Sequence, residues 1–159
     1  MATEPGGTLT GWVWALEEMR WRRAFPGTLD QVPVARRFAG AMFEGSPCAD
    51  VVEYAVAELA GNALRHSDSA EKGGWFGVEL VHDDPVHVAV TDIGGKGVPA
   101  VRDCVDEFAE SGRGLHMLSR FAISLGVHGS AGKGHTVWVD LDLEQSLEAL
   151  LERELPDTP

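Results

Sequence analysis

A carboxylate, a carboxamide and an imidazole recur at helical spacing near the middle of this 159-residue chain. Glu58, Asn62 and His66 follow one another at intervals of four residues, which places them in one row along a helix. The segment that carries them, residues 50–67, is strongly periodic, as expected for a helix that turns about 100° per residue. Asn62 is a mediocre helix former, so its place inside a helix needs another reason. The row predicts either a polar border to the core or a chemical site.

The same helix must also bury an apolar stripe. Val52, Val56, Leu59 and Ala63 fall within one narrow sector of the helical wheel, as in a helix that faces a core. The polar row therefore runs along the edge of the buried surface. Taken alone, such a row is more often structural than catalytic, so the neighbouring segments must decide between the two.

Two glycine-rich segments bracket one long connection, and the second is suited to an anionic ligand. Residues 92–99 read DIGGKGVP directly after a predicted strand, which indicates a sharp bend or a close approach of another group. Residues 112–115 read GRGL and open a predicted helix, whose N-terminal amides carry partial positive charge and can hold phosphate. A lone GxG most often marks a turn, so its value here depends on the order of the motifs.

Composition limits the partners and the compartment. The net charge of −12 argues against a nucleic-acid surface, and the 44% apolar content is enough for the core of one domain. The first twenty residues lack a signal-peptide pattern, and no apolar run approaches the ~20 residues needed to cross a bilayer. Cys48 and Cys104 have no metal-ligand or CxxC spacing. We therefore expect a cytoplasmic protein, not bound to a membrane, with two reduced core thiols.

Hydrophobic periodicity predicts the elements that position these residues. Strands are predicted over 19–25, 75–82, 86–91, 123–128 and 135–141. Helices are predicted over 31–44, 50–67, 112–122 and 143–155, with a further short one within 100–111. Asp142 and Gln145 are expected to cap the last long helix. This order predicts an α+β two-layer sandwich, with helices on one face of a mixed, mainly antiparallel sheet. We expect a partly disordered extension (1–20), one domain (21–155) and a tail (156–159).

The order of the motifs resembles a known superfamily. An ExxxNAxxH helix is followed by a strand ending in DxGG, then by GRGL at a helix start, then by a strand with GxT. This order is similar to that of the GHKL nucleotide-binding superfamily, whose fold is also called the Bergerat or histidine-kinase-like ATPase fold. Within it, the chain resembles the small anti-sigma-factor serine kinases of actinobacterial type. The resemblance runs from about Trp21 to Leu141 and implies ATP and Mg²⁺ as cofactors.

The resemblance implies a role for each matching residue. Asn62 would be the side-chain ligand of a Mg²⁺ ion that bridges the ATP phosphates, and Glu58 would be the general base for the attacking hydroxyl. Asp92 would accept a hydrogen bond from the adenine amino group. The other implied nucleotide-binding positions are Arg65 and His66 in a supporting role, Gly94 beside the base, Gly97 in a lid formed by residues 95–111, Gly112, Arg113, Gly114 and Leu115 at the phosphates, and Thr136 near the adenine beside Asp92.

The resemblance also implies a function. We expect an ATP-dependent serine/threonine protein kinase that acts as an anti-sigma factor, forms a homodimer and phosphorylates an anti-anti-sigma (STAS-type) antagonist. The alternative is a nucleotide-responsive or nucleotide-free regulator that sequesters a partner without chemistry. One departure keeps it open, since Lys96 stands where the usual DxGxG box has its second glycine, with Gly97 next. A sensor histidine kinase or a gyrase-like ATPase would need further segments.

Overall fold

The computed structural model describes residues 18–66, 70–93, 113–130 and 133–154. Five strands form one sheet in the order β1-β2-β3-β5-β4, and each neighbouring pair is antiparallel. The strands are β1 (Met19–Pro26), β2 (Trp75–His82), β3 (Val86–Asp92), β4 (Ser124–Ser130) and β5 (Gly134–Leu141). The helices are α2 (Gln31–Met42), α3 (Ala49–His66), α5 (Arg113–Phe121) and α6 (Leu147–Glu154).

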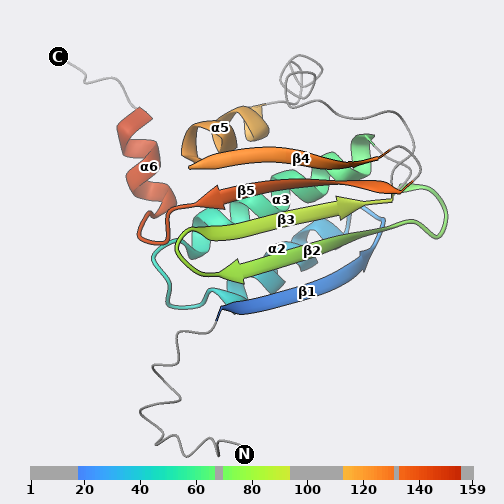
Figure 1. Cartoon of the computed structure of the whole chain (residues 1–159), viewed down its shortest axis with the longest axis horizontal. Coiled ribbons are helices and arrows are strands. Elements are labelled where there is room, and N and C mark those ends of the chain that lie inside the picture. Colours follow the sequence, from blue (N-terminus) through green and yellow to red (C-terminus); the bar gives the residue numbers. More distant parts are fainter. Residues whose placement is uncertain (1–17, 67–69, 94–112, 131–132, 155–159) are drawn as a thin grey trace, which may run out of the picture.

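The elements form two layers. Helices α2 and α3 cover one face of the sheet, and Figure 1 shows the opposite face turned toward the viewer with no described helix across it. We call this second face the open face. The predicted α+β sandwich is confirmed, and all described strands are antiparallel. Within the described ranges, no helix is both long and apolar enough to cross a membrane.

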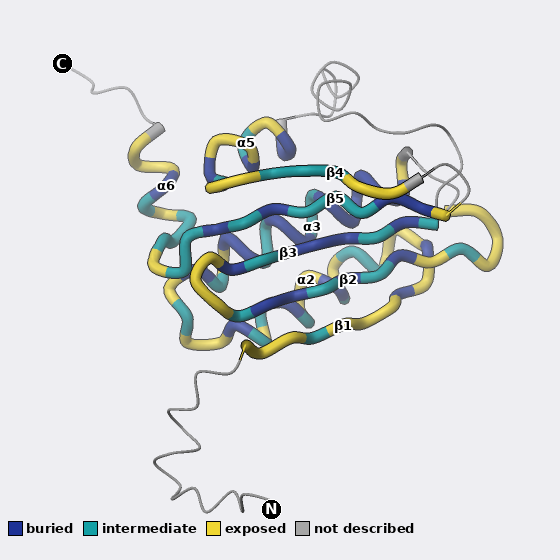
Figure 2. The backbone as a smooth tube through the Cα atoms, viewed as in Figure 1, coloured by how far each residue is buried: buried dark blue, intermediate teal, exposed yellow. Residues whose placement is uncertain are grey.

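Helix α3 provides the centre of the core. Its predicted stripe is buried, with Val52 and Val56 fully inaccessible and Leu59 almost so. In β3, Val88 and Val90 face this helix and are buried as well, and Figure 2 shows the buried stretches of both elements. Cys48 is a free thiol in the same core, and burial raises its pKa to about 11, so it stays protonated. Its predicted role as a small core residue is confirmed, whereas Cys104 lies outside the described residues.

Helix α3 runs alongside β3 in the same direction (Figure 1). At its first turn, the Asp50 carboxylate accepts a hydrogen bond of 3.1 Å from the Leu147 amide, soon after β5 ends. Val86, the first residue of β3, pairs with Leu141 at the same end of the sheet. The last turns of α3 therefore lie at the opposite end, where β3 finishes at Asp92 and β5 begins.

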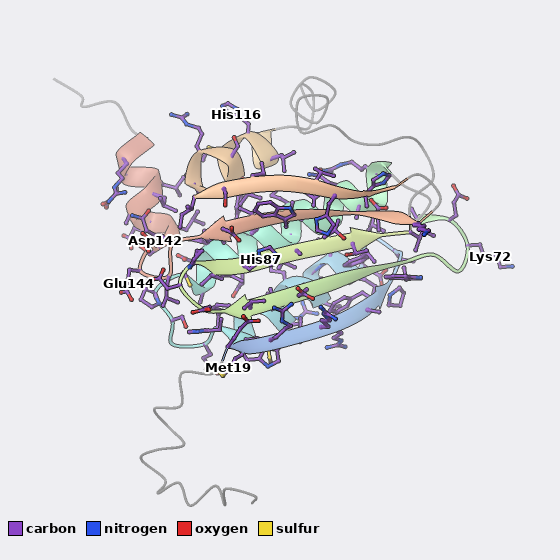
Figure 3. The ribbon with its side chains drawn as sticks, in the orientation of Figure 1. Met19, Lys72, His87, His116, Asp142 and Glu144 are labelled. Carbon is purple, nitrogen blue, oxygen red and sulfur yellow. The ribbon has the colours of Figure 1, made fainter. Side chains whose placement is uncertain are left out.

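The C-terminal helix begins later than predicted. Asp142 does not cap it, because its carboxylate accepts a hydrogen bond from the Glu144 amide and forms a local turn instead. The cap is Ser146, whose hydroxyl oxygen accepts a 3.2 Å hydrogen bond from the Ala149 amide. Figure 3 shows Asp142 and Glu144 in this connection, beside α6. Strand β4 is also shifted toward the C-terminus, and the predicted short helix within 100–111 lies outside the described residues.

Gly134, the first residue of β5, packs against the end of β3 so closely that no side chain would fit. Its φ is +94°, and a Cβ built there would lie 2.1 Å from the carbonyl oxygen of Asp92. Gly45 has a similar φ of +82° but open space around it. Gly134→Ala is expected to destabilise the fold by roughly 2–5 kcal/mol, since left-handed strain and overpacking add, whereas Gly45→Ala costs only about 1–2 kcal/mol. Urea unfolding of both variants checks this difference, and equal losses would contradict it.

Candidate active site

Three polar or charged side chains are buried among the described residues, namely Asn62 at 8% exposure, Asp92 at 7% and His135 at 2%. Asn62 belongs to the last turns of α3, Asp92 ends β3, and His135 is the second residue of β5. All three therefore lie at the same end of the molecule. Buried polar groups are costly unless they are paired, so their concentration at one end indicates a functional site.

The row along α3 is present as predicted. The Asn62 side-chain oxygen accepts a hydrogen bond of 2.8 Å from the Arg65 guanidinium. Glu58, one turn earlier, is half-buried, and this burial raises the pKa of its carboxyl, partly offset by the positive charge of Arg65. Glu58 therefore keeps its proton to a higher pH than an exposed glutamate does. Once ionised, it is a stronger base.

Glu58 lies against the first turn of α5. A Cβ built on Gly114 would be 1.6 Å from the Glu58 Oε2 atom, so only a glycine leaves room for this carboxylate. The Tyr54 hydroxyl donates a 3.2 Å hydrogen bond to the Gly114 carbonyl. Burial, with a smaller effect from the charge of Glu58, raises the pKa of Tyr54 and keeps this donor protonated. The structure thus brings the ExxxN row and the GRGL segment together.

The start of α5 is a suitable place for an anion. Its N-terminal amides carry partial positive charge, which favours a negatively charged group beside them. Leu115 follows Gly114, but its side chain is buried in the core. Any contact between Leu115 and a phosphate would therefore be made by its backbone.

The prediction that Thr136 lies beside Asp92 is wrong. Thr136 pairs with Thr91 in the register of β3 and β5, and their hydroxyls hydrogen-bond at 2.7 Å on the open face. Asp92 is on the other face, where its Oδ1 atom accepts a 3.1 Å hydrogen bond from the backbone amide of His135. Strand alternation from the buried Val139 was the signal that could have identified His135 as the neighbour.

Several predicted positions are not described. Gly94, Lys96, Gly97 and Gly112 lie outside the described residues, as does the predicted lid at 95–111. His66 and Arg113 occupy the last residue of α3 and the first of α5, where only the backbone is described. Their predicted roles remain predictions.

A concavity of about 510 Å³ lies on the open face, across the sheet from Glu58 and Asn62. Two of its charged groups, Arg22 and Glu79, form an ion pair with each other. His87, which Figure 3 shows on this face, has its Nδ1 atom 2.6 Å from an Asp140 carboxylate oxygen. The candidate site lies at the opposite face, because the three buried polar groups and the start of α5 lie there.

The residues around Asn62 fit a magnesium ion. Among the described residues there is no group of three or more His, Cys, Asp and Glu side chains that could hold a metal by themselves. Mg²⁺ needs no such group, since it commonly binds one or two protein oxygens and takes water and phosphate for the rest. The Asn62 oxygen already faces a cationic group, the guanidinium of Arg65. The position and polarity of the Asn62 oxygen therefore suit the role of a single protein ligand of Mg²⁺.

A family model described as a histidine kinase-like ATPase domain matches residues 25–141 of the chain. The matched span contains Glu58, Asn62, Asp92 and the GRGL segment, together with the strands β2 to β5 and the last two residues of β1. No curated protein matches the chain.

Gly114→Ala should displace the Glu58 carboxylate and leave the fold intact, because the clashing atom is the end of a flexible side chain. The pKa of Glu58 should then fall toward the ordinary value of 4.5, as the carboxyl moves into water. Measuring the Glu58 pKa by NMR titration tests this directly.

Gly61→Ala is the matched control. A Cβ there would meet Arg65 at an ordinary 3.6 Å, so the Glu58 pKa should not change. Both variants replace a helical glycine and should gain up to ~1 kcal/mol of stability from helix propensity. An unchanged Glu58 pKa in Gly114→Ala would contradict the contact.

Proposed function

We propose that this chain transfers a phosphoryl group from ATP to a serine or threonine of a protein partner. The chain belongs to the histidine kinase-like ATPase family. Membership of the family implies ATP binding, usually with Mg²⁺. The observation that carries the proposal is the half-buried Glu58, which lies one turn from Asn62 and against the start of α5. This arrangement supports a general base next to a phosphate site.

Each described residue has a distinct task in this proposal. Asp92 binds the base, Asn62 holds Mg²⁺, and the amides at the start of α5 receive phosphate oxygens. When bound, the metal would neutralise negative charge on the transferred phosphoryl group. Glu58 accepts the proton of the attacking hydroxyl, a contribution typically worth ~10²–10⁴-fold in rate. Because phosphoryl transfer depends mainly on positioning and charge, no further covalent role is required.

The similarity of the motifs to anti-sigma-factor serine kinases supports a regulatory role. In this role the chain acts as a homodimer, binds a sigma factor in one state, and phosphorylates a STAS-type antagonist in another. The antagonist then supplies the hydroxyl that Glu58 deprotonates. Lys96, in place of a glycine in the first box, favours a second function: a regulator that binds its partner without phosphorylating it.

Calorimetric titration with ATP, with and without Mg²⁺, tests the site. Binding should require Mg²⁺ for full affinity, and Asp92→Asn should weaken it at least tenfold because the carboxylate acceptor is lost. Asp140→Asn is the matched control, since Asp140 also lies in the strand pair β3–β5 but on the open face. The affinity of this variant for ATP should equal that of the wild type. No binding to the wild-type protein at millimolar ATP would reject the kinase.

Glu58→Gln separates the two functions. It should lower the rate of phosphoryl transfer to the antagonist by ~10²–10⁴-fold, with ATP affinity changed less than about threefold. In the wild-type protein the rate should fall as the pH drops, because the protonated carboxyl is no base, and the midpoint should lie above 4.5 since burial raises this pKa. The measurement is transfer of radiolabelled phosphate from ATP. ATP binding without transfer to any antagonist or sigma factor would favour the non-catalytic regulator.

A further inference from the structure

One buried polar atom is left unsatisfied at the site. The imidazole of His135 is 2% exposed, and in the described part of the chain its Nε2 atom has no hydrogen-bond partner. Buried polar atoms in native proteins are nearly always paired, and an unpaired one costs free energy. The position of Nε2 therefore calls for a partner that the described residues do not provide.

The neighbouring carboxylate sets the chemistry of the ring. His135 Nδ1 lies 3.9 Å from Asp92 Oδ1, the same oxygen that accepts the His135 backbone amide. A proton on Nδ1 faces the negative charge of Asp92, whereas a lone pair there would face it unfavourably. With the proton on Nδ1, the neutral ring presents Nε2 as a hydrogen-bond acceptor. Asp92 and His135 then form a pair of neighbouring acceptors.

We infer that His135 is a specificity-determining residue of the nucleotide site, whose Nε2 accepts a hydrogen bond from the exocyclic amino group of a bound 6-aminopurine. This inference rests on the proposed function, because it requires a nucleotide beside Asp92. An amino group has two N–H donors, one for Asp92 and one for His135. A 6-oxopurine presents a carbonyl oxygen to the same two acceptors and is repelled.

The neighbouring Thr136 provides the internal comparison. It is the next residue in β5, but its hydroxyl is paired with Thr91 on the open face. If this part of β5 had a purely structural role, substitution of either residue would change nucleotide affinity in the same way. If His135 binds the base, only its substitution changes the affinity, and only for the group at purine position 6.

The test measures dissociation constants for ATP and for inosine triphosphate, which carries an oxygen in place of the amino group. Wild-type protein should prefer ATP by at least tenfold, since a site built to bind a donor rejects an analogue that lacks it. His135→Phe keeps a ring of similar size and should lose most of this preference, mainly through weaker ATP binding. His135→Gln, which can restore an acceptor, should recover part of it. Thr136→Val should match the wild type within about twofold for both nucleotides.

A second measurement needs no substitution and does not depend on how the variants fold. The ¹⁵N chemical shift of His135 Nε2 should move when ATP is added, because the lone pair gains a hydrogen bond. Inosine triphosphate should not produce this shift.

The outcomes are distinguishable. If the wild-type protein binds ATP but His135→Phe keeps the full preference, or if ATP leaves the Nε2 shift unchanged, the amino group does not bind Nε2 and the inference is overturned. If the wild-type protein binds no ATP, the proposed function itself fails.

Discussion

The packing of α3 against β3 is the contact on which the rest of the structure depends. Because Leu59 and Ala63 must face the sheet, the neighbouring Glu58 and Asn62 are fixed at the border of the core. At this border Glu58 is half-buried, and its burial is what raises its pKa. The acid–base character of the site therefore follows from hydrophobic packing, with no charged partner needed to produce it.

A second constraint acts where β3 and β5 meet. Gly134 allows the two strands to approach so closely that the Asp92 carbonyl fills the space of a Cβ. This approach brings the side chain of Asp92 to the backbone of His135 on the helix-facing side. The next pair, Thr91 and Thr136, is satisfied by a mutual hydrogen bond on the open face. The alternation of side chains along the strands thus places the paired hydroxyls of Thr91 and Thr136 on the open face. It places His135, whose Nε2 atom has no partner among the described residues, on the helix-facing side.

Sequence patterns predicted the elements well where periodicity extends over many residues. Helix α3 was expected over 50–67 and spans Ala49–His66, since its apolar stripe is long and uninterrupted. The start of α6 was wrong, because Asp142 and Gln145 imitate a capping pair while Asp50, far away in the sequence, accepts the Leu147 amide. Thr136 was misplaced for another reason. The match to a GxT motif does not establish which face of the sheet the threonine side chain lies on, because a shift of one residue along a strand moves the side chain to the other face.

The contact between Arg65 and Asn62 bears on how the site would receive a metal ion. A guanidinium can only donate hydrogen bonds, so the oxygen of the Asn62 amide, and not its nitrogen, must point toward Arg65. A carboxamide oxygen has two lone pairs, and the hydrogen bond uses one of them. Arg65 therefore orients Asn62 while leaving capacity for another cation. A carboxylate at position 62 would instead form an ion pair with Arg65 and bind it more strongly. In the proposed function, a neutral amide would hold the arginine weakly enough for an ATP phosphate to compete for it.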